Sequence, residues 1–285
     1  MASKGVFATC NRSRAVNSWS YRCGDGRSQG ATVEAPAANA TTMLHAQARI
    51  DLAAAFRWAA RWNLHESIAN HFSVAVSDDG RQFLLNPVGR HFSTIRASEL
   101  LLLDAADPTT MQGPDAPDPT AWYLHAQLHQ HLPQARCILH SHMPNATALC
   151  CLQGYEFLML DQNACRFYQR IAYDRDYCGM AFDASEGERV ARLMGPGKSV
   201  LFMGNHGVMV VAPSVAQALD ELYYLEKACA LQVLALSTGR PLAVLSDVVA
   251  ARAGAQWNDY PTPFSAQHLG ELKRILDTHE PDYAT

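Results

Sequence analysis

The sequence of 285 residues lacks three features that define common functional classes. Its eight cysteines include no Cys-x-x-Cys pair, which argues against a zinc ribbon or a thioredoxin-type site. Its longest apolar runs, after Glu99 and after Gly207, are far too short to cross a bilayer. Its net charge of -4 gives no reason to expect nucleic acid or an anionic membrane as a partner. We therefore expect a globular cytoplasmic protein whose scattered cysteines stay reduced.

The first forty-odd residues are nearly free of acidic side chains and are rich in Ser, Ala, Gly and Arg. They lack the continuous apolar segment of a secretory signal. Met43 stands immediately before the first segment with a regular hydrophobic period. We interpret residues 1–44 as a disordered tail or an over-extended start, with an organellar transit peptide as the alternative. Residues 45–285 are long enough to form a single domain with one sizeable core.

The hydrophobic pattern after residue 45 switches repeatedly between the helical and the strand period. Helices are predicted over 46–62, from 118 or 120, from 145, over 183–194, from 214 and over 265–279. Strands are predicted in a hairpin over 71–87, after 99, over 135–142, and on both sides of 204–207. Because this order is mixed and not strictly βαβ, it predicts an α/β sandwich with a largely antiparallel sheet.

Two histidines, His140 and His142, end the predicted strand ARCILHSH. Residues two apart on a strand point to the same face, so the two imidazoles can hold one divalent cation together. His206 is the natural third ligand, because it lies between two glycines in the kink GNHG. A helix places His125 and His129 on one face as well, but HAQLH lacks the glutamate that a zincin needs. We therefore predict a metal site at His140, His142 and His206.

Three segments together resemble the class II aldolase/adducin family. They are HESIANHFSVAVSDDGRQFLLNPVGRHFS, WYLHAQLHQHLPQARCILHSHMPNATAL and LFMGNHGVMVVAPSVAQALDELYYLEKACALQ. The resemblance covers roughly residues 46–245, and it implies an α/β/α sandwich in a homotetramer with active sites between subunits. It also implies that a divalent metal, usually zinc, is bound by His140, His142 and His206. In such enzymes the metal acts as a Lewis acid on a substrate hydroxyl or carbonyl.

The chain departs from the family pattern at two places. The catalytic aldolases carry a glutamate four residues before a histidine of the predicted helix. In this sequence that histidine is His125, and the position of the glutamate is Ala121. Without that carboxylate the usual proton transfer lacks its base. The sugar-phosphate enzymes carry Gly and Asn where this sequence has Asn70 and His71, which argues against a phosphorylated substrate. His71 does match a related branch of the family that reads GHIS.

Four groups can replace the missing base: a metal-bound hydroxide, Tyr168, Asp161 or Glu66. The sequence thus predicts a lyase of aldolase type that acts on a small oxygenated acid or aldehyde through one Zn2+ per subunit. A three-histidine site leaves more metal positions open, which makes an Fe2+-dependent oxygenase or decarboxylase the first alternative. A scaffold protein of adducin type, which keeps the fold without the chemistry, is the second.

Overall fold

The computed structural model describes residues 43–113, 116–177 and 179–285. The predicted tail lies outside these residues except at its last two positions. The residues from 42 onward form one compact unit. No helix in the described segments is long and apolar enough to cross a membrane.

The described residues contain helices and strands in mixed order. The helices are α1 (Ala46–Arg61), α2 (Pro119–His131), α3 (Pro144–Cys150), α4 (Ala184–Met194), α5 (Val215–Ser237), α6 (Asp247–Asn258) and α7 (Phe264–His279). The strands are β1 (His71–Ala75), β2 (Gln82–Leu85), β3 (Leu101–Asp104), β4 (Cys137–Ser141), β5 (Ile171–Asp174), β6 (Val200–Met203) and β7 (Gly207–Ala212).

The strands form a single seven-stranded sheet in the order β3-β2-β1-β4-β7-β6-β5. Every neighbouring pair is antiparallel except β5 and β6, which run parallel. Strand β4 lies at the centre, and its five residues are all buried. The predicted hairpin is confirmed, since Ser73 pairs with Leu85 and Ala75 with Phe83.

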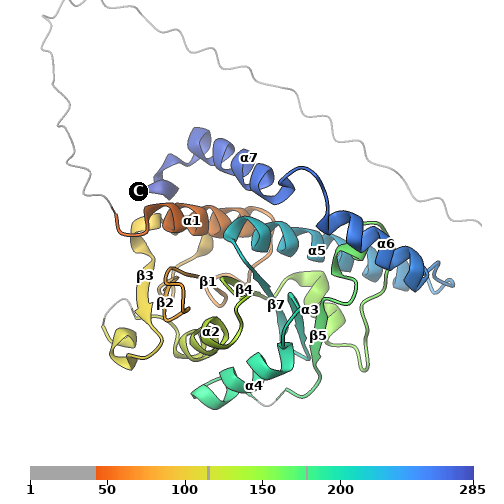
Figure 1. The fold of residues 1–285 in the computed structure, drawn as a ribbon, viewed down its shortest axis with the longest axis horizontal. Coiled ribbons are helices and arrows are strands. Elements are labelled where there is room, and N and C mark those ends of the chain that lie inside the picture. Colours follow the sequence, from red (N-terminus) through yellow and green to blue (C-terminus); the bar gives the residue numbers. More distant parts are fainter. Residues whose placement is uncertain (1–42, 114–115, 178) are drawn as a thin grey trace, which may run out of the picture. The chain divides into compact units, whose positions relative to one another are not determined.

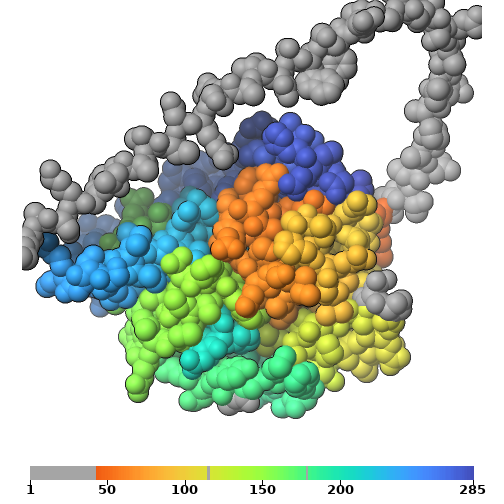
Figure 2. All heavy atoms as spheres, turned by 180° about the vertical axis from the view of Figure 1, so that it is seen from behind, coloured from red at the N-terminus to blue at the C-terminus, as the bar shows by residue number. Residues whose placement is uncertain are grey.

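Helices cover both faces of the sheet, as Figure 1 shows. Helices α2 and α4 pack together on one face, where a core of residues from β4, β6 and β7 lies under them. Helices α1, α3 and α5 cover the other face over the larger core, and α7 packs on α1 and α5. In Figure 2 the blue atoms of α7 and the green atoms of α4 lie at opposite sides of the molecule. The predicted α/β/α sandwich is therefore confirmed.

The structure contains two elements that the hydrophobic pattern did not predict, β5 and α6. Strand β5 has only four residues, too few for a clear period. Helix α6 buries only Ala250 and Gly254. A Cβ added at Gly254 would lie 2.8 Å from the backbone oxygen of Cys165, so the helix packs through its smallest residues. Small residues carry little hydrophobic signal, which explains why α6 escaped prediction.

Candidate metal centre

Strand β4 positions the first two histidines. His140 lies on the strand and His142 immediately after its end, so the two-residue period directs both toward one face. His140 is only 2% exposed, while the side chain of His142 is 18% exposed. Protein therefore encloses the His140 imidazole, whereas the His142 imidazole is partly exposed to solvent.

The turn between β6 and β7 supplies His206. Asn205 has a positive φ of 54°, which lets the chain reverse within the turn. The backbone N–H of Gly204 donates to the carbonyl oxygen of Asp174 at 2.7 Å, and that of Asn205 donates to Cys150 at 3.1 Å. Strand β5 and helix α3 therefore hold the His206 turn from two sides.

Gly207 makes room for the second histidine. A Cβ at this position would lie 2.7 Å from Cδ2 of His142 and 2.7 Å from the carbonyl oxygen of Ser141. Both distances are below ordinary contact, so a side chain at residue 207 would displace the His142 ring. The second glycine of GNHG is required by this close approach.

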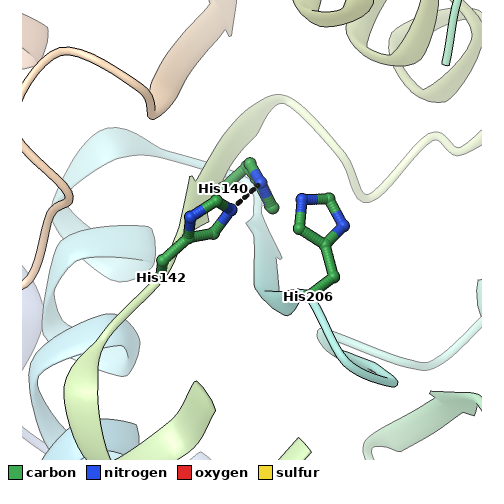
Figure 3. Close-up of side chains that lie close together, drawn as sticks. All are labelled: His140, His142 and His206. Carbon is green, nitrogen blue, oxygen red and sulfur yellow. Dashed lines mark hydrogen bonds between the residues drawn. The ribbon is translucent and has the colours of Figure 1, made fainter. Parts of the chain in front are cut away.

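His140, His142 and His206 converge, and their ligand atoms lie within 4.8 Å of one another. Figure 3 shows the three rings around one point, with the Nε2 atoms of His140 and His142 joined by the dashed line at 3.1 Å. We call these three residues the metal histidines. Three imidazoles at such spacing form a ligand set that could hold a metal ion.

The hydrogen bonds of the Nδ1 atoms determine that the Nε2 atoms of His140 and His142 face the point between the three rings. Nδ1 of His140 donates to the carbonyl oxygen of Val208 at 3.1 Å, and Nδ1 of His142 donates to the carboxylate of Glu66. In neutral rings both Nε2 atoms therefore carry lone pairs, which repel at 3.1 Å unless a cation lies between them. The two Nε2 atoms would therefore face a bound cation, which would relieve this repulsion.

Burial keeps His140 and His206 in the neutral form that binds metal. Desolvation, with help from nearby His142, lowers the pKa of His206 to about 4. Desolvation also lowers the pKa of His140 well below its ordinary value, and His71 adds to the effect. Near neutral pH the nitrogen lone pairs of His140 and His206 are therefore free to bind a metal ion.

A cavity of about 260 Å³ opens beside the metal histidines. Its wall comes from α2, α4, the loop after β5 and the His206 turn. The polar side chains that line it are His71, His140, His142 and His206, together with Asp118, Thr120, Asp174, Tyr177, Glu186 and Arg189. A space of this volume suits a small ligand in contact with the metal position.

Arg189 is the one Lys or Arg among the residues that line this cavity. Its Nε and Nη2 each donate to Glu186 at 2.8 Å, and its Nη1 donates to Asp174 at 3.1 Å. These carboxylates raise the pKa of Arg189. Because two acids already neutralise this guanidinium, the lining offers no unpaired cation for a phosphate group.

The structure separates the three side chains that the sequence suggested as replacement bases. Glu66 accepts a hydrogen bond from His142 and is the one that touches the metal histidines. Asp161 accepts instead from the backbone N–H of Ala164 at 2.8 Å. The Tyr168 hydroxyl lies 3.5 Å from Gln169, and its Cβ lies near Gly254 of α6. None of the three is among the residues that line the cavity.

Asp118 and His71 are two of the cavity residues that were not predicted as site residues. Asp118 caps α2 by accepting from the backbone N–H of Thr120 at 2.8 Å, and its carboxylate lines the cavity. His71 is the antiparallel partner of His140, with ring centroids 4.7 Å apart. Ala121 is 1% exposed and packs in a small core with Phe83. The N-cap position of α2 was the signal that could have found Asp118. The pairing of β1 with β4 was the signal that could have found His71.

Residues 50–233 match the family described as Class II Aldolase and Adducin N-terminal domain. The chain belongs to the class II aldolase and adducin family. A protein of Caulobacter vibrioides that is named for aldolase class 2 is 32% identical over 200 residues, which are 70% of this chain and 77% of that protein. The decarboxylase NovR of Streptomyces niveus is 27% identical over 77% of this chain and 80% of its own length.

Another relative is the 4-hydroxy-3-prenylphenylpyruvate oxygenase/4-hydroxy-3-prenylbenzoate synthase of Streptomyces roseochromogenus, which is 26% identical over 68% of this chain and 72% of its own. Among solved structures, an aldolase II superfamily protein from Pseudomonas syringae superposes with a TM-score of 0.75 and 31% identity. That match covers 84% of this chain and 96% of the other. The family thus includes relatives named for several different reactions.

Proposed function

We propose that this protein is a metal-dependent lyase of class II aldolase type, which acts on a small oxygenated acid or aldehyde. The observation that carries the proposal is the pair of Nε2 atoms 3.1 Å apart, both with lone pairs directed at one point. The outer nitrogens of both rings are already engaged as donors, as expected of metal ligands.

The metal that we expect is one Zn2+ per subunit, with Fe2+ as the alternative. His140, His142 and His206 would hold it and leave further positions open for water or substrate. Such a cation polarises a bound hydroxyl or carbonyl oxygen and stabilises negative charge that develops there. The residues of the chain then orient the substrate and exclude bulk water.

The cavity supports a small, unphosphorylated substrate. Its volume is about 260 Å³, and its single guanidinium is paired with Asp174 and Glu186. A phosphate group would therefore lie among carboxylates without a free cation. A hydroxy acid or an aldehyde gains its charge partner from the metal itself, so it does not need one in the wall.

The absence of a carboxylate at Ala121 favours the second candidate, an Fe2+-dependent oxygenase or decarboxylase. Ala121 is buried in a small core, so the helix supplies no fourth protein ligand from that position. The relatives named as a decarboxylase and as an oxygenase/synthase agree with this alternative. The adducin-type scaffold stays the third candidate, and a homotetramer in the cytoplasm is the assembly that we expect.

Metal analysis of the purified protein tests the proposal, with His142→Ala as the variant. We expect stoichiometric zinc in the native protein and loss of most of it in the variant, because two imidazoles hold the ion poorly. His131→Ala is the matched control, since His131 is exposed at the end of α2 and its side chain bonds to Gln127, away from the metal histidines. Stoichiometric iron with oxygen uptake would favour the oxygenase. A native protein that contains no divalent metal would contradict both enzyme proposals and favour the adducin-type scaffold.

A further inference from the structure

Strand β1 and helix α2 bring a second set of histidines together beneath the cavity. His71 and Ser73 lie two apart on one face of β1, and His125 and His129 lie four apart on one face of α2. Where α2 packs on β1, these faces meet. We call these four residues the buried chain, because each is 8% exposed or less.

The buried chain is a continuous run of hydrogen bonds. Nδ1 of His71 lies 2.7 Å from Nε2 of His125, and Nδ1 of His125 bonds to Oγ of Ser73. Oγ of Ser73 lies 2.7 Å from Nε2 of His129. Nδ1 of His129 ends the run 2.6 Å from the carbonyl oxygen of Ala135.

The last acceptor fixes the direction of the whole run. A carbonyl oxygen cannot donate, so His129 must carry its proton on Nδ1 and accept at Nε2. Ser73 then donates to His129 and accepts from Nδ1 of His125. His125 in turn accepts at Nε2, so His71 must donate from Nδ1.

This deduction holds for neutral rings, and burial keeps them neutral. Desolvation lowers the pKa of His129 to about 3 and that of His71 to about 3. It also lowers the pKa of His125 well below its ordinary value, with His71 contributing. A proton added at His129 would reverse the three bonds between His129 and His71 and leave the one to Ala135 unchanged, but burial makes this protonation unfavourable at neutral pH.

Only one nitrogen of the buried chain is left without a partner in the described residues, and it belongs to His71. With Nδ1 committed to His125, Nε2 of His71 carries a lone pair. His71 lines the cavity, and its ring lies 4.7 Å from that of His140. It stands outside the compact group of the metal histidines.

We propose that Nε2 of His71 is a fixed hydrogen-bond acceptor for a hydroxyl group of the substrate bound beside the metal. Ser73, His125 and His129 are positioning residues that hold His71 in this single tautomer. The inference rests on the proposed function, and it narrows the substrate to molecules that present a hydroxyl donor to the cavity wall. It also assigns a polar role to residue 71, one of the two positions at which this sequence differs from the sugar-phosphate enzymes.

Histidine-labelled NMR of the metal-free protein tests the tautomers directly. Long-range 1H–15N correlations near neutral pH should show His71, His125 and His129 all as the Nδ1–H form. Because no metal is present, this result does not depend on whether the proposed lyase is correct. An Nε2–H form at His71 would overturn the inference even if the protein binds stoichiometric zinc.

Ser73→Ala tests whether the run imposes the tautomer. It removes the acceptor of His125 and the donor to His129, so the His71 signal should lose its single-tautomer signature. Ser199→Ala is the control, since Ser199 is equally buried and its hydroxyl has no partner in the described residues. An unchanged His71 signal in a folded Ser73→Ala protein would refute the positioning role.

His71→Asn tests the acceptor itself. The amide nitrogen of asparagine stands where Nδ1 stood and can still donate to His125, whereas Nε2 is gone. We expect unchanged zinc content and about tenfold weaker binding of glycolate, the loss that corresponds to one ordinary hydrogen bond. Acetate, which lacks the hydroxyl, should bind equally to both proteins in calorimetry. Equal losses for glycolate and acetate, or no loss for glycolate, would overturn the proposal.

Discussion

The metal histidines and the buried chain are built from the same side chain and adjoin each other across one strand pair, since His71 pairs with His140. In the first group, the Nε2 atoms of His140 and His142 direct lone pairs at each other. In the second, the ring lone pairs of His125 and His129 each accept a proton, and only Nε2 of His71 is left without a partner in the described residues. The partner of Nδ1 therefore decides what a buried histidine can do with Nε2.

The largest expected effect comes from Gly207→Ala, which should break the metal histidines and spare the buried chain. The new Cβ would meet Cδ2 of His142 and the oxygen of Ser141, each at 2.7 Å. We expect a destabilisation of about 1–3 kcal/mol from overpacking. We also expect metal affinity to fall by at least the roughly 10–100-fold seen when outer partners are disturbed. Urea unfolding and metal titration measure the two effects.

Gly270→Ala is the control for that substitution. Gly270 lies in α7, and a Cβ there meets nothing within 4 Å. Alanine should stabilise this helix by about 0.5–1 kcal/mol and leave the metal content unchanged. If Gly207→Ala keeps wild-type metal affinity, the close approach at His142 does not hold the ring as the geometry indicates.

A smaller effect is expected from Glu66→Gln, which sharpens the comparison by changing only an outer partner. The amide keeps an oxygen for Nδ1 of His142 but loses the negative charge. Metal affinity should fall roughly tenfold, at the lower end of the range for outer partners, because Glu66 is 64% exposed. Competition with a chelator measures it. Glu188→Gln, on the exposed side of α4, should change nothing.

The last prediction concerns the pH dependence of stability in metal-free protein, to which the buried chain contributes. The pKa of His129 is lowered to about 3 in the folded state, against about 6.5 when unfolded. At a pH between these two pKa values, His129 is protonated in the unfolded chain and neutral in the folded one. Stability is therefore complete above about pH 6.5 and falls as the pH drops, by about 1.4 kcal/mol per pH unit for each such group.

His129→Gln should reduce the slope of folding stability against pH by about the contribution of one histidine. Urea unfolding between about pH 7 and pH 5 measures this change. His131→Gln, two residues away on the same helix, should leave it unchanged because His131 is exposed. A wild-type slope in His129→Gln would mean that the proton uptake on unfolding comes from other residues.

The sequence predicted what short-range geometry determines. The period of a strand placed His140 and His142 on one face, and the glycines of GNHG marked the turn that carries His206. These three residues come together as expected. Most helices and strands also followed from hydrophobic periods, because those periods record which face of each element is buried, whereas the two helical layers were implied by the family resemblance.

The sequence did not predict contacts that depend on how distant elements pack. The bond between His71 and His125 joins residues 54 positions apart, and it forms because α2 lies on β1 at one particular offset. Tyr168 was one of the candidate bases, yet its neighbour in space is α6, a helix whose small buried residues hid it from prediction. Side-chain chemistry was readable from sequence, but distance in space was not.

Asp174 has a consequence for motion in the cavity wall. Its side chain binds Arg189 of α4, and its backbone oxygen holds Gly204 in the turn that carries His206. One residue thus couples a wall helix to a metal histidine. We therefore expect a ligand that displaces α4 to shift the turn that carries His206 as well.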